Sequence, residues 1–192
     1  MKEYFIPFEF EIKNYINECL LALGEVDRTQ VRAYTRTKDH MVKYAPKFIN
    51  NLLKHFQHEP LLYRFYVTPA NKQLNPHIDG GDGSLRVPMT LNLPILGTEN
   101  TETLWYDSSD ETNYRYLSTV NHNYTRGITT KNHKRLVEIQ KLTVNKPYFI
   151  KTDIFHAVKN HNDNTRIMLT VRWIDDNFTK GFEFTEPNDV LI

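Results

Sequence analysis

Residues 1–60 place apolar side chains at the three-to-four-residue spacing of amphipathic helices. One stripe runs through Glu9–Leu23 and is followed by Gly24, a residue suited to the end of a helix. A second stripe runs through Met41–His58, where Pro46 suits a first helical turn. The segment between the two stripes is polar and irregular. We therefore expect two helices that cover the back of a sheet, because apolar stripes of this kind are usually core.

Beyond Pro60 the apolar pattern changes to the alternation of β-strands. Strands are expected where alternation combines with β-branched and aromatic content. They cover residues 61–68, 85–93, 103–107, 135–144, 148–158 and 166–174. The last strand has one apolar face, and its other face combines two arginines with Met and Thr: Arg166, Met168, Thr170 and Arg172. This mixed face predicts either a polar-lined cavity or a solvent-exposed surface.

Two turns are expected to join neighbouring strands as hairpins. The strongest turn signal in the chain is Gly80–Gly83, and it predicts a hairpin in which His77 faces Arg86. A polar turn at residues 159–164 predicts a second hairpin between the last two strands. In the first hairpin Arg86 would share a face with His77. Its positive charge would repel a bound metal cation unless an anion, such as an oxoacid carboxylate, lay between them.

The length of 192 residues fits a single domain with its own core. We expect helical support from residues 1–60, a β core from 61–174 and a tail from 175–192 with a short edge strand near Phe182. Residues 108–134 are polar and predict a long insertion within the core. A loop of that length in a compact domain is usually functional, so it is a candidate lid or substrate-recognition element.

The charge is nearly balanced, with 24 Lys and Arg residues against 23 Asp and Glu residues and a net charge of +1. A chain with so small a net charge has no strong positive electrostatic field that would attract nucleic acid or an anionic membrane. The small basic cluster at Lys131–Arg135 is expected to be a solvated loop. The single cysteine, Cys19, excludes a disulfide framework and is expected to be buried. No apolar run reaches transmembrane length, and we expect a soluble, cytoplasmic protein.

The candidate chemistry centres on Asn75–Asp79. The Asn-Pro pair favours extended backbone, and side chains two apart on a strand share a face, so His77 and Asp79 are expected to point the same way. A further histidine would complete the set of two imidazoles and one carboxylate that holds Fe(II) and leaves its other side open to reactants. We choose His156, because it lies in a strand-like stretch before a polar turn, and Arg166 follows it by ten residues.

This order of residues resembles the iron(II)- and 2-oxoglutarate-dependent oxygenase superfamily, whose core is a double-stranded β-helix. The resemblance covers about Leu61 to Trp173 and rests on His-x-Asp, a distant His and an Arg ten residues later. It implies an α+β, mainly β fold of jelly-roll, cupin-like type with N-terminal packing helices. It also implies that His77, Asp79 and His156 bind Fe(II) and that Arg166 binds 2-oxoglutarate. The implied reaction uses O2 to hydroxylate an unactivated C–H bond of an amino acid, a protein side chain or a small molecule, releasing succinate and CO2.

Arg86 adds a partial similarity to the aspartyl/asparaginyl β-hydroxylase branch, in which a second arginine contacts 2-oxoglutarate. It follows His77 by nine residues, which is similar to the spacing in that branch. The sequence departs from the branch at Asp79, because those hydroxylases lack the carboxylate ligand. This departure weakens the inference that this protein acts on the substrate of that branch. The metal-binding residues of the wider superfamily are preserved.

Four more side chains are candidates for contacts at the site. Thr90 and Asn92 alternate with Arg86 on one expected strand, so they share its face and could donate hydrogen bonds to the same ligand. Trp105 and Tyr106 lie on the next expected strand and are candidate substrate contacts at the mouth of the pocket. Core packing is the alternative for both aromatic residues.

Two other functions compete with the oxygenase. A cupin-type metalloenzyme that does not use 2-oxoglutarate would keep the three metal-binding residues but would have no use for Arg166. A non-catalytic β-barrel with a binding or structural role would contain the His-x-Asp sequence by accident. Loss of 2-oxoglutarate turnover in an Arg166 variant would separate the oxygenase from the first alternative, and Fe(II) binding would separate it from the second.

Overall fold

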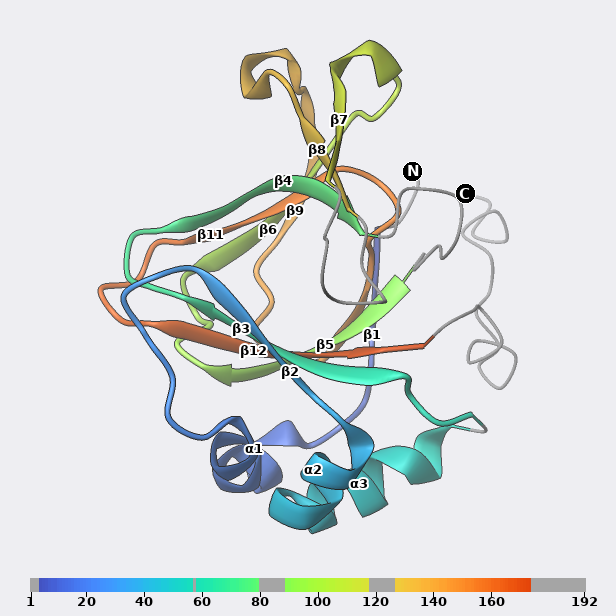
Figure 1. Cartoon of the computed structure of the whole chain (residues 1–192), viewed down its shortest axis with the longest axis vertical. Coiled ribbons are helices and arrows are strands. Elements are labelled where there is room, and N and C mark those ends of the chain that lie inside the picture. The colour runs from blue at the N-terminus through green and yellow to red at the C-terminus, as the bar shows by residue number, and fades with distance from the viewer. Residues whose placement is uncertain (1–3, 57, 80–88, 118–126, 174–192) are drawn as a thin grey trace.

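The computed structural model describes residues 4–56, 58–79, 89–117 and 127–173. Within these residues two antiparallel sheets of six strands each lie face to face (Figure 1). The helix-backed sheet contains β1 (Phe5–Pro7), β2 (Arg32–Arg36), β3 (Leu62–Thr68), β5 (Met89–Leu96), β10 (Tyr148–Lys151) and β12 (Arg166–Arg172), in the order β1-β10-β5-β12-β3-β2. The outer sheet contains β4 (Gln73–Asp79), β6 (Thr101–Tyr106), β7 (Tyr114–Leu117), β8 (Gly127–Thr130), β9 (Glu138–Leu142) and β11 (His156–Asn160), in the order β7-β8-β4-β11-β6-β9.

The chain passes back and forth between the two sheets. From β3 to β6 consecutive strands alternate between the helix-backed and the outer sheet, and the alternation resumes from β10 to β12. Paired sheets wound in this way form a double-stranded β-helix, the jelly-roll architecture. The α+β, mainly β fold with N-terminal helices predicted from the sequence is therefore confirmed.

Both hairpins predicted from the sequence are wrong, because the turns join strands of different sheets. β4 pairs with β8 and β11, whereas β5 pairs with β10 and β12. β11 pairs with β4 and β6, and β12 pairs with β3 and β5. His77 therefore lies opposite His156 and Thr129. The Gly80–Gly83 turn and Arg86 lie outside the described residues.

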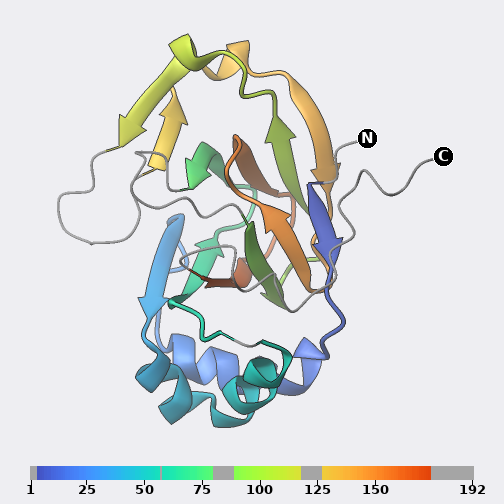
Figure 2. The same ribbon diagram turned by 90° about the vertical axis from the view of Figure 1, so that its right-hand side faces the viewer.

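Three α-helices lie together below the strands and cover the outer face of the helix-backed sheet, as Figure 2 shows from a second direction. They are α1 (Ile16–Leu23), α2 (Lys38–Tyr44) and α3 (Pro46–Leu52), with 3₁₀ turns at Ile12–Tyr15 and Leu53–His55. The second predicted stripe forms two helices, because the chain breaks at Ala45 and Pro46 begins α3. α2 begins earlier than predicted, since the Thr37 hydroxyl caps it by accepting a hydrogen bond from the His40 N–H. None of the helices in the described residues is long and apolar enough to span a membrane.

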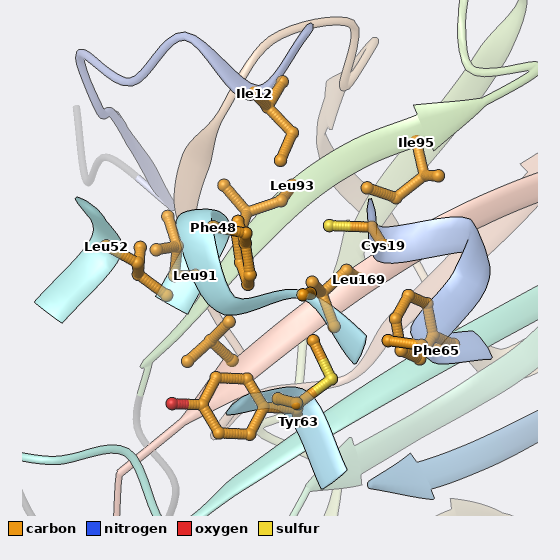
Figure 3. Close-up of a cluster of buried hydrophobic side chains, with 14 of the residues drawn as sticks. Ile12, Cys19, Phe48, Leu52, Tyr63, Phe65, Leu91, Leu93, Ile95 and Leu169 are labelled. Carbon is orange, nitrogen blue, oxygen red and sulfur yellow. The ribbon is translucent and has the colours of Figure 1, made fainter. Parts of the chain in front are cut away.

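The main core lies between the helices and the helix-backed sheet. Cys19, Phe48 and Leu52 extend from the helices toward this sheet (Figure 3). The sheet meets them with alternate residues of three strands: Tyr63, Phe65, Val67, Leu91, Leu93, Ile167, Leu169 and Val171. The apolar face predicted for the last strand thus belongs to the core, and its mixed face turns toward the space between the sheets. Cys19 is buried, as predicted, and burial raises the pKa of its thiol.

Four strands lie in segments that we did not predict to be strands, and the first of them, β1, precedes the first helical stripe. β2 follows α1 in a polar segment, and β7 and β8 lie within residues 108–134, which we predicted to be a long insertion. β8 pairs with β4, and β7 pairs with β8, so these residues extend the outer sheet (Figure 1). The side chains of β2 are largely exposed, and an exposed edge strand needs no apolar alternation. The edge strand expected near Phe182 lies outside the described residues.

Two leucines of α1 give a direct test of this packing. Leu23 is 1% exposed in the main core, whereas Leu21 is 68% exposed. Leu23→Ala is expected to lower the free energy of unfolding by about 2–5 kcal/mol, because it removes buried methyl groups and leaves a cavity. Leu21→Ala is expected to change it by less than about 0.5 kcal/mol. Urea unfolding of both variants measures the difference, and equal losses would show that α1 does not pack as described.

Candidate metal site

The candidate site lies where β4 and β11 pair in the outer sheet. The register of this pair places His77 directly opposite His156, and the two imidazole ring centres are 4.4 Å apart. Asp79 is two residues beyond His77 and therefore lies on the same face of β4. One potential ligand atom from each of the three residues lies within 4.8 Å of the others. The strand pair thus brings together side chains that are far apart in the sequence.

Both imidazoles use the same ring nitrogen for a contact with the backbone. The Nδ1 atom of His77 lies 2.8 Å from the Asn75 carbonyl oxygen, and that of His156 lies 3.0 Å from the Ile154 carbonyl oxygen. A carbonyl oxygen only accepts hydrogen bonds, so each Nδ1 donates. In a neutral imidazole this leaves the Nε2 lone pair available to a metal ion.

Burial keeps His156 in the form that binds a metal. His156 is 4% exposed, and burial, together with the neighbouring His77, lowers its pKa to about 4. The ring is therefore neutral near pH 7, when its nitrogen can coordinate a cation. Its pKa is low even though the nearby Asp79 carboxylate favours the charged ring.

Asp79 is held as a carboxylate by the positive groups around it. Burial alone would raise its pKa, but Arg172 and, to a smaller extent, the two histidines lower it to about 2. The Arg172 Nη2 atom donates to Asp79 Oδ2 at 2.5 Å, across the space between the two sheets. The other oxygen, Oδ1, lies 3.7 Å from the His77 Nε2 atom. Two imidazole nitrogens and one carboxylate oxygen match the donor set that holds Fe(II) in non-heme oxygenases.

A cavity between the sheets joins these three residues to the mixed face of β12. Its wall includes Tyr66, His77, Asp79, Thr90, Asn92, His156, Arg166, Met168, Thr170 and Arg172. The sequence left open whether the mixed face borders a cavity or solvent, and the structure shows a cavity. Arg166, Thr90 and Asn92, which we predicted to contact a co-substrate, all lie on its wall.

Arg166 is a buried cation whose charge has no acidic partner among the described residues. It is 1% exposed, and its Nε atom has no hydrogen-bond partner in the described part of the chain. Burial lowers its pKa to about 10, so the guanidinium remains charged near pH 7. An unpaired buried charge is costly, and an anionic ligand in the cavity would compensate it.

Thr90 and Asn92 belong to a small polar group on the cavity wall. Asn92 Oδ1 accepts a hydrogen bond from the Thr170 hydroxyl at 2.9 Å and lies 3.5 Å from the Thr90 hydroxyl. All three side chains are buried. This group fixes the orientation of the Asn92 amide on the wall opposite the outer sheet.

Trp105 and Tyr106 do not lie on the cavity wall. Trp105 is fully buried, stacks on Tyr4 and Phe5, and donates its indole N–H to the Lys151 carbonyl oxygen at 2.8 Å. Tyr106 packs against the small apolar cluster that contains Ile78. Core packing, the alternative for both residues, therefore explains them better than a pocket mouth does.

Two residues of the site were missed in the sequence. Arg172 lies on the face that we predicted to be mixed, but nothing in the sequence linked it to Asp79. Tyr66 lies on β3, and its hydroxyl accepts a hydrogen bond from Arg172 at 2.8 Å. Its position on the inward face of an alternating strand was the only available signal.

The burial of His156 predicts how the stability of the metal-free protein depends on pH. A histidine has a pKa of about 6.5 in an unfolded chain and about 4 here. As the pH falls through this interval the unfolded state binds a proton that the folded state does not, so stability decreases. We expect a loss of about 2–3 kcal/mol between pH 6.5 and 4, measured by urea unfolding in the presence of EDTA. Asp79, whose pKa is lowered to about 2, loses its own contribution from about pH 5 downward and mostly below pH 4.

His156→Gln is the matched control for that measurement, because glutamine fills similar space and does not titrate. The variant is expected to lose most of the pH dependence between pH 6.5 and 4. An identical slope in both proteins would mean that His156 is not the buried neutral group.

Comparisons with known proteins find similarity among solved structures only. No protein family and no curated protein matches the sequence. The chain is similar to the non-heme alpha-ketoglutarate-dependent carbocyclase SnoK from nogalamycin biosynthesis, with a TM-score of 0.52 and 12% identity over 89% of this chain and 78% of that one. At this identity the likeness shows the fold alone.

Two other similar structures align less well. Oxalate decarboxylase from Bacillus subtilis has a TM-score of 0.38 and 9% identity over 81% of this chain, and the chain spans only 28% of its length. L-ribose isomerase from Acinetobacter sp. DL28 has a TM-score of 0.38 and 12% identity over 76% of this chain and 59% of that one.

Proposed function

We propose that this protein is an Fe(II)- and 2-oxoglutarate-dependent dioxygenase in which His77, Asp79 and His156 hold the metal. The observation that carries the proposal is the convergence of one nitrogen from each imidazole and one carboxylate oxygen within 4.8 Å, beside a cavity that also contains a buried arginine. Bound Fe(II), 2-oxoglutarate and O2 together supply the oxidising power to hydroxylate an unactivated C–H bond, with release of succinate and CO2. The substrate is an amino acid, a protein side chain or a small molecule.

Arg166 supports the use of a diacid co-substrate. Its planar guanidinium can bind the far carboxylate of 2-oxoglutarate through two parallel hydrogen bonds, which an ammonium group cannot do as well. Thr90 and Asn92 lie on the same cavity wall and add polar contacts, and Arg86 is proposed as a second anchor from outside the described residues. The similar carbocyclase is alpha-ketoglutarate dependent, which agrees with this assignment.

The chain's own groups position the reactants and exclude water. The carbonyl oxygens that accept from Nδ1 fix both imidazole rings, and Arg172 fixes Asp79. Residues of β5 and β12 form the cavity wall on the side of the helix-backed sheet and separate these residues from solvent on that side. This is the usual division of labour, in which the cofactor supplies the chemistry and the protein supplies orientation. We further propose one catalytic domain, with residues 1–60 as its support.

The test is succinate formation from 2-oxoglutarate. The purified protein is incubated aerobically with Fe(II), ascorbate and 2-oxoglutarate, first alone and then with panels of amino acids, peptides and small metabolites. We expect succinate that depends on added Fe(II), disappears with EDTA and increases with a matching substrate. Tight metal binding without any succinate formation would favour the cupin-type metalloenzyme that does not use 2-oxoglutarate.

A further inference from the structure

The contacts of Arg172 indicate a more specific role than fixing the position of Asp79. It lies at the end of β12, is 2% exposed, and approaches the metal-binding residues from the helix-backed sheet. Its Nη2 atom donates to two acceptors, Asp79 Oδ2 at 2.5 Å and the Tyr66 hydroxyl at 2.8 Å. Its Nε and Nη1 atoms have no hydrogen-bond partner within the described residues. Among the described residues the guanidinium therefore has one charged partner, the Asp79 carboxylate, and one neutral partner, the Tyr66 hydroxyl.

The pair determines which carboxylate oxygen can face the imidazoles. Asp79 Oδ2 is bound to Arg172, while Oδ1 lies 3.7 Å from His77 Nε2. A carboxylate with both oxygens free can bind a metal through one oxygen or through two. A charge-assisted hydrogen bond to one oxygen in a buried site opposes the second arrangement, because binding through both oxygens would weaken that bond.

We propose that Arg172 is a positioning residue that holds Asp79 as a one-oxygen ligand and so keeps three coordination positions free for reactants. This inference rests on the proposed metal site. A six-coordinate ion that is bound by two imidazoles and one carboxylate oxygen has three open positions. If Asp79 bound through both oxygens, only two would remain, which is too few for a two-point chelating co-substrate and O2 together.

Tyr66 holds the arginine in place for this role. Its hydroxyl accepts from the same Nη2 atom, and its ring centre lies 5.9 Å from the Arg172 Cζ atom. Tyr66 and Arg172 belong to neighbouring strands, β3 and β12, and both contribute to the cavity wall. The arginine is thus anchored on the helix-backed sheet while it contacts a residue of the outer sheet. Simple charge compensation of Asp79 would not require this second contact.

Counting the water molecules on a bound Mn(II) ion tests the inference without any co-substrate. Mn(II) accepts nitrogen and oxygen ligands, and its effect on water proton relaxation reports how many exchangeable waters it carries. The wild-type protein with one Mn(II) is expected to carry three. Arg172→Met, which keeps an apolar side chain of similar length, is expected to bind Mn(II) and to carry two, a loss of about one third of the inner-sphere relaxation.

The outcomes separate this inference from the proposed function. Three waters in both proteins would show that Arg172 does not control how Asp79 binds the ion. Two waters in the wild type would show that Asp79 already binds through both oxygens. Either result overturns the inference and leaves the metal site intact. Absence of Mn(II) binding by the wild type would overturn the metal site itself. Circular dichroism checks that Arg172→Met is folded, and if it is not, the wild-type count alone decides.

Discussion

Replacing His77 with alanine is expected to weaken Fe(II) binding by more than about 100-fold and to abolish 2-oxoglutarate turnover. Loss of a group that only supports a metal ligand typically costs 10–100-fold in affinity, and His77 is proposed as a ligand itself. The His77 side chain lies on the cavity wall and is 18% exposed, so its removal enlarges that cavity rather than opening a void in the main core, and the fold should persist. Anaerobic titration with Fe(II), followed by calorimetry, measures the affinity of each protein.

His161→Ala is the matched control for the His77 variant. His161 lies on the surface, where its Nε2 atom is 3.0 Å from a Glu102 oxygen, and its side chain is 46% exposed. Exposed ion pairs contribute little to stability, so this change should leave Fe(II) affinity within about twofold of the wild type. Wild-type affinity in the His77 variant, or an equal loss in both variants, would contradict the assignment of His77.

Replacing Arg166 with methionine is expected to separate metal binding from co-substrate binding. Truncating one partner of a buried charged pair typically costs about 2–5 kcal/mol, so the dissociation constant of 2-oxoglutarate should rise by about 30-fold or more. Fe(II) affinity should change only a few-fold, because Arg166 donates no ligand. The folded state should tolerate the change, since the substitution removes a buried charge without an acidic partner among the described residues.

Arg32→Met makes the same chemical change at an exposed position on β2, where the side chain lies 3.7 Å from Asp27. It should leave the binding of both Fe(II) and 2-oxoglutarate unchanged. Succinate release at varied 2-oxoglutarate concentration compares the three proteins. Unchanged turnover by the Arg166 variant would exclude its role as the diacid anchor and favour a metalloenzyme of another kind.

The pair His77 and Asp79 was predictable because it depends only on local backbone. An extended chain places side chains two apart on one face, and β4 is extended through both residues. His156 was chosen from its local context, and the residue lies opposite His77 in the β4–β11 pair. The sequence did not reveal that pairing. We predicted hairpins between neighbouring strands, whereas the chain crosses between sheets at each of these turns.

Arg172 shows what local pattern could not reveal. Alternation placed it on the mixed face of the last strand, and it does lie there. Its bond to Asp79 depends on the distance between two sheets, which no periodicity encodes. Trp105 was a candidate for the mouth of the pocket, but its side chain is fully buried. Burial of the indole is possible because its N–H donates a hydrogen bond to the Lys151 carbonyl oxygen.

The most direct test of the account is an anaerobic titration of the protein with Fe(II) in the presence of 2-oxoglutarate, followed by visible absorption. If His77, Asp79 and His156 hold one ion beside Arg166, the weak charge-transfer band of the Fe(II)–2-oxoglutarate chelate should appear and saturate at one Fe(II) per chain. The His77→Ala protein should not develop it. A folded wild-type protein that shows no band, or a band that persists without His77, would contradict the central claim.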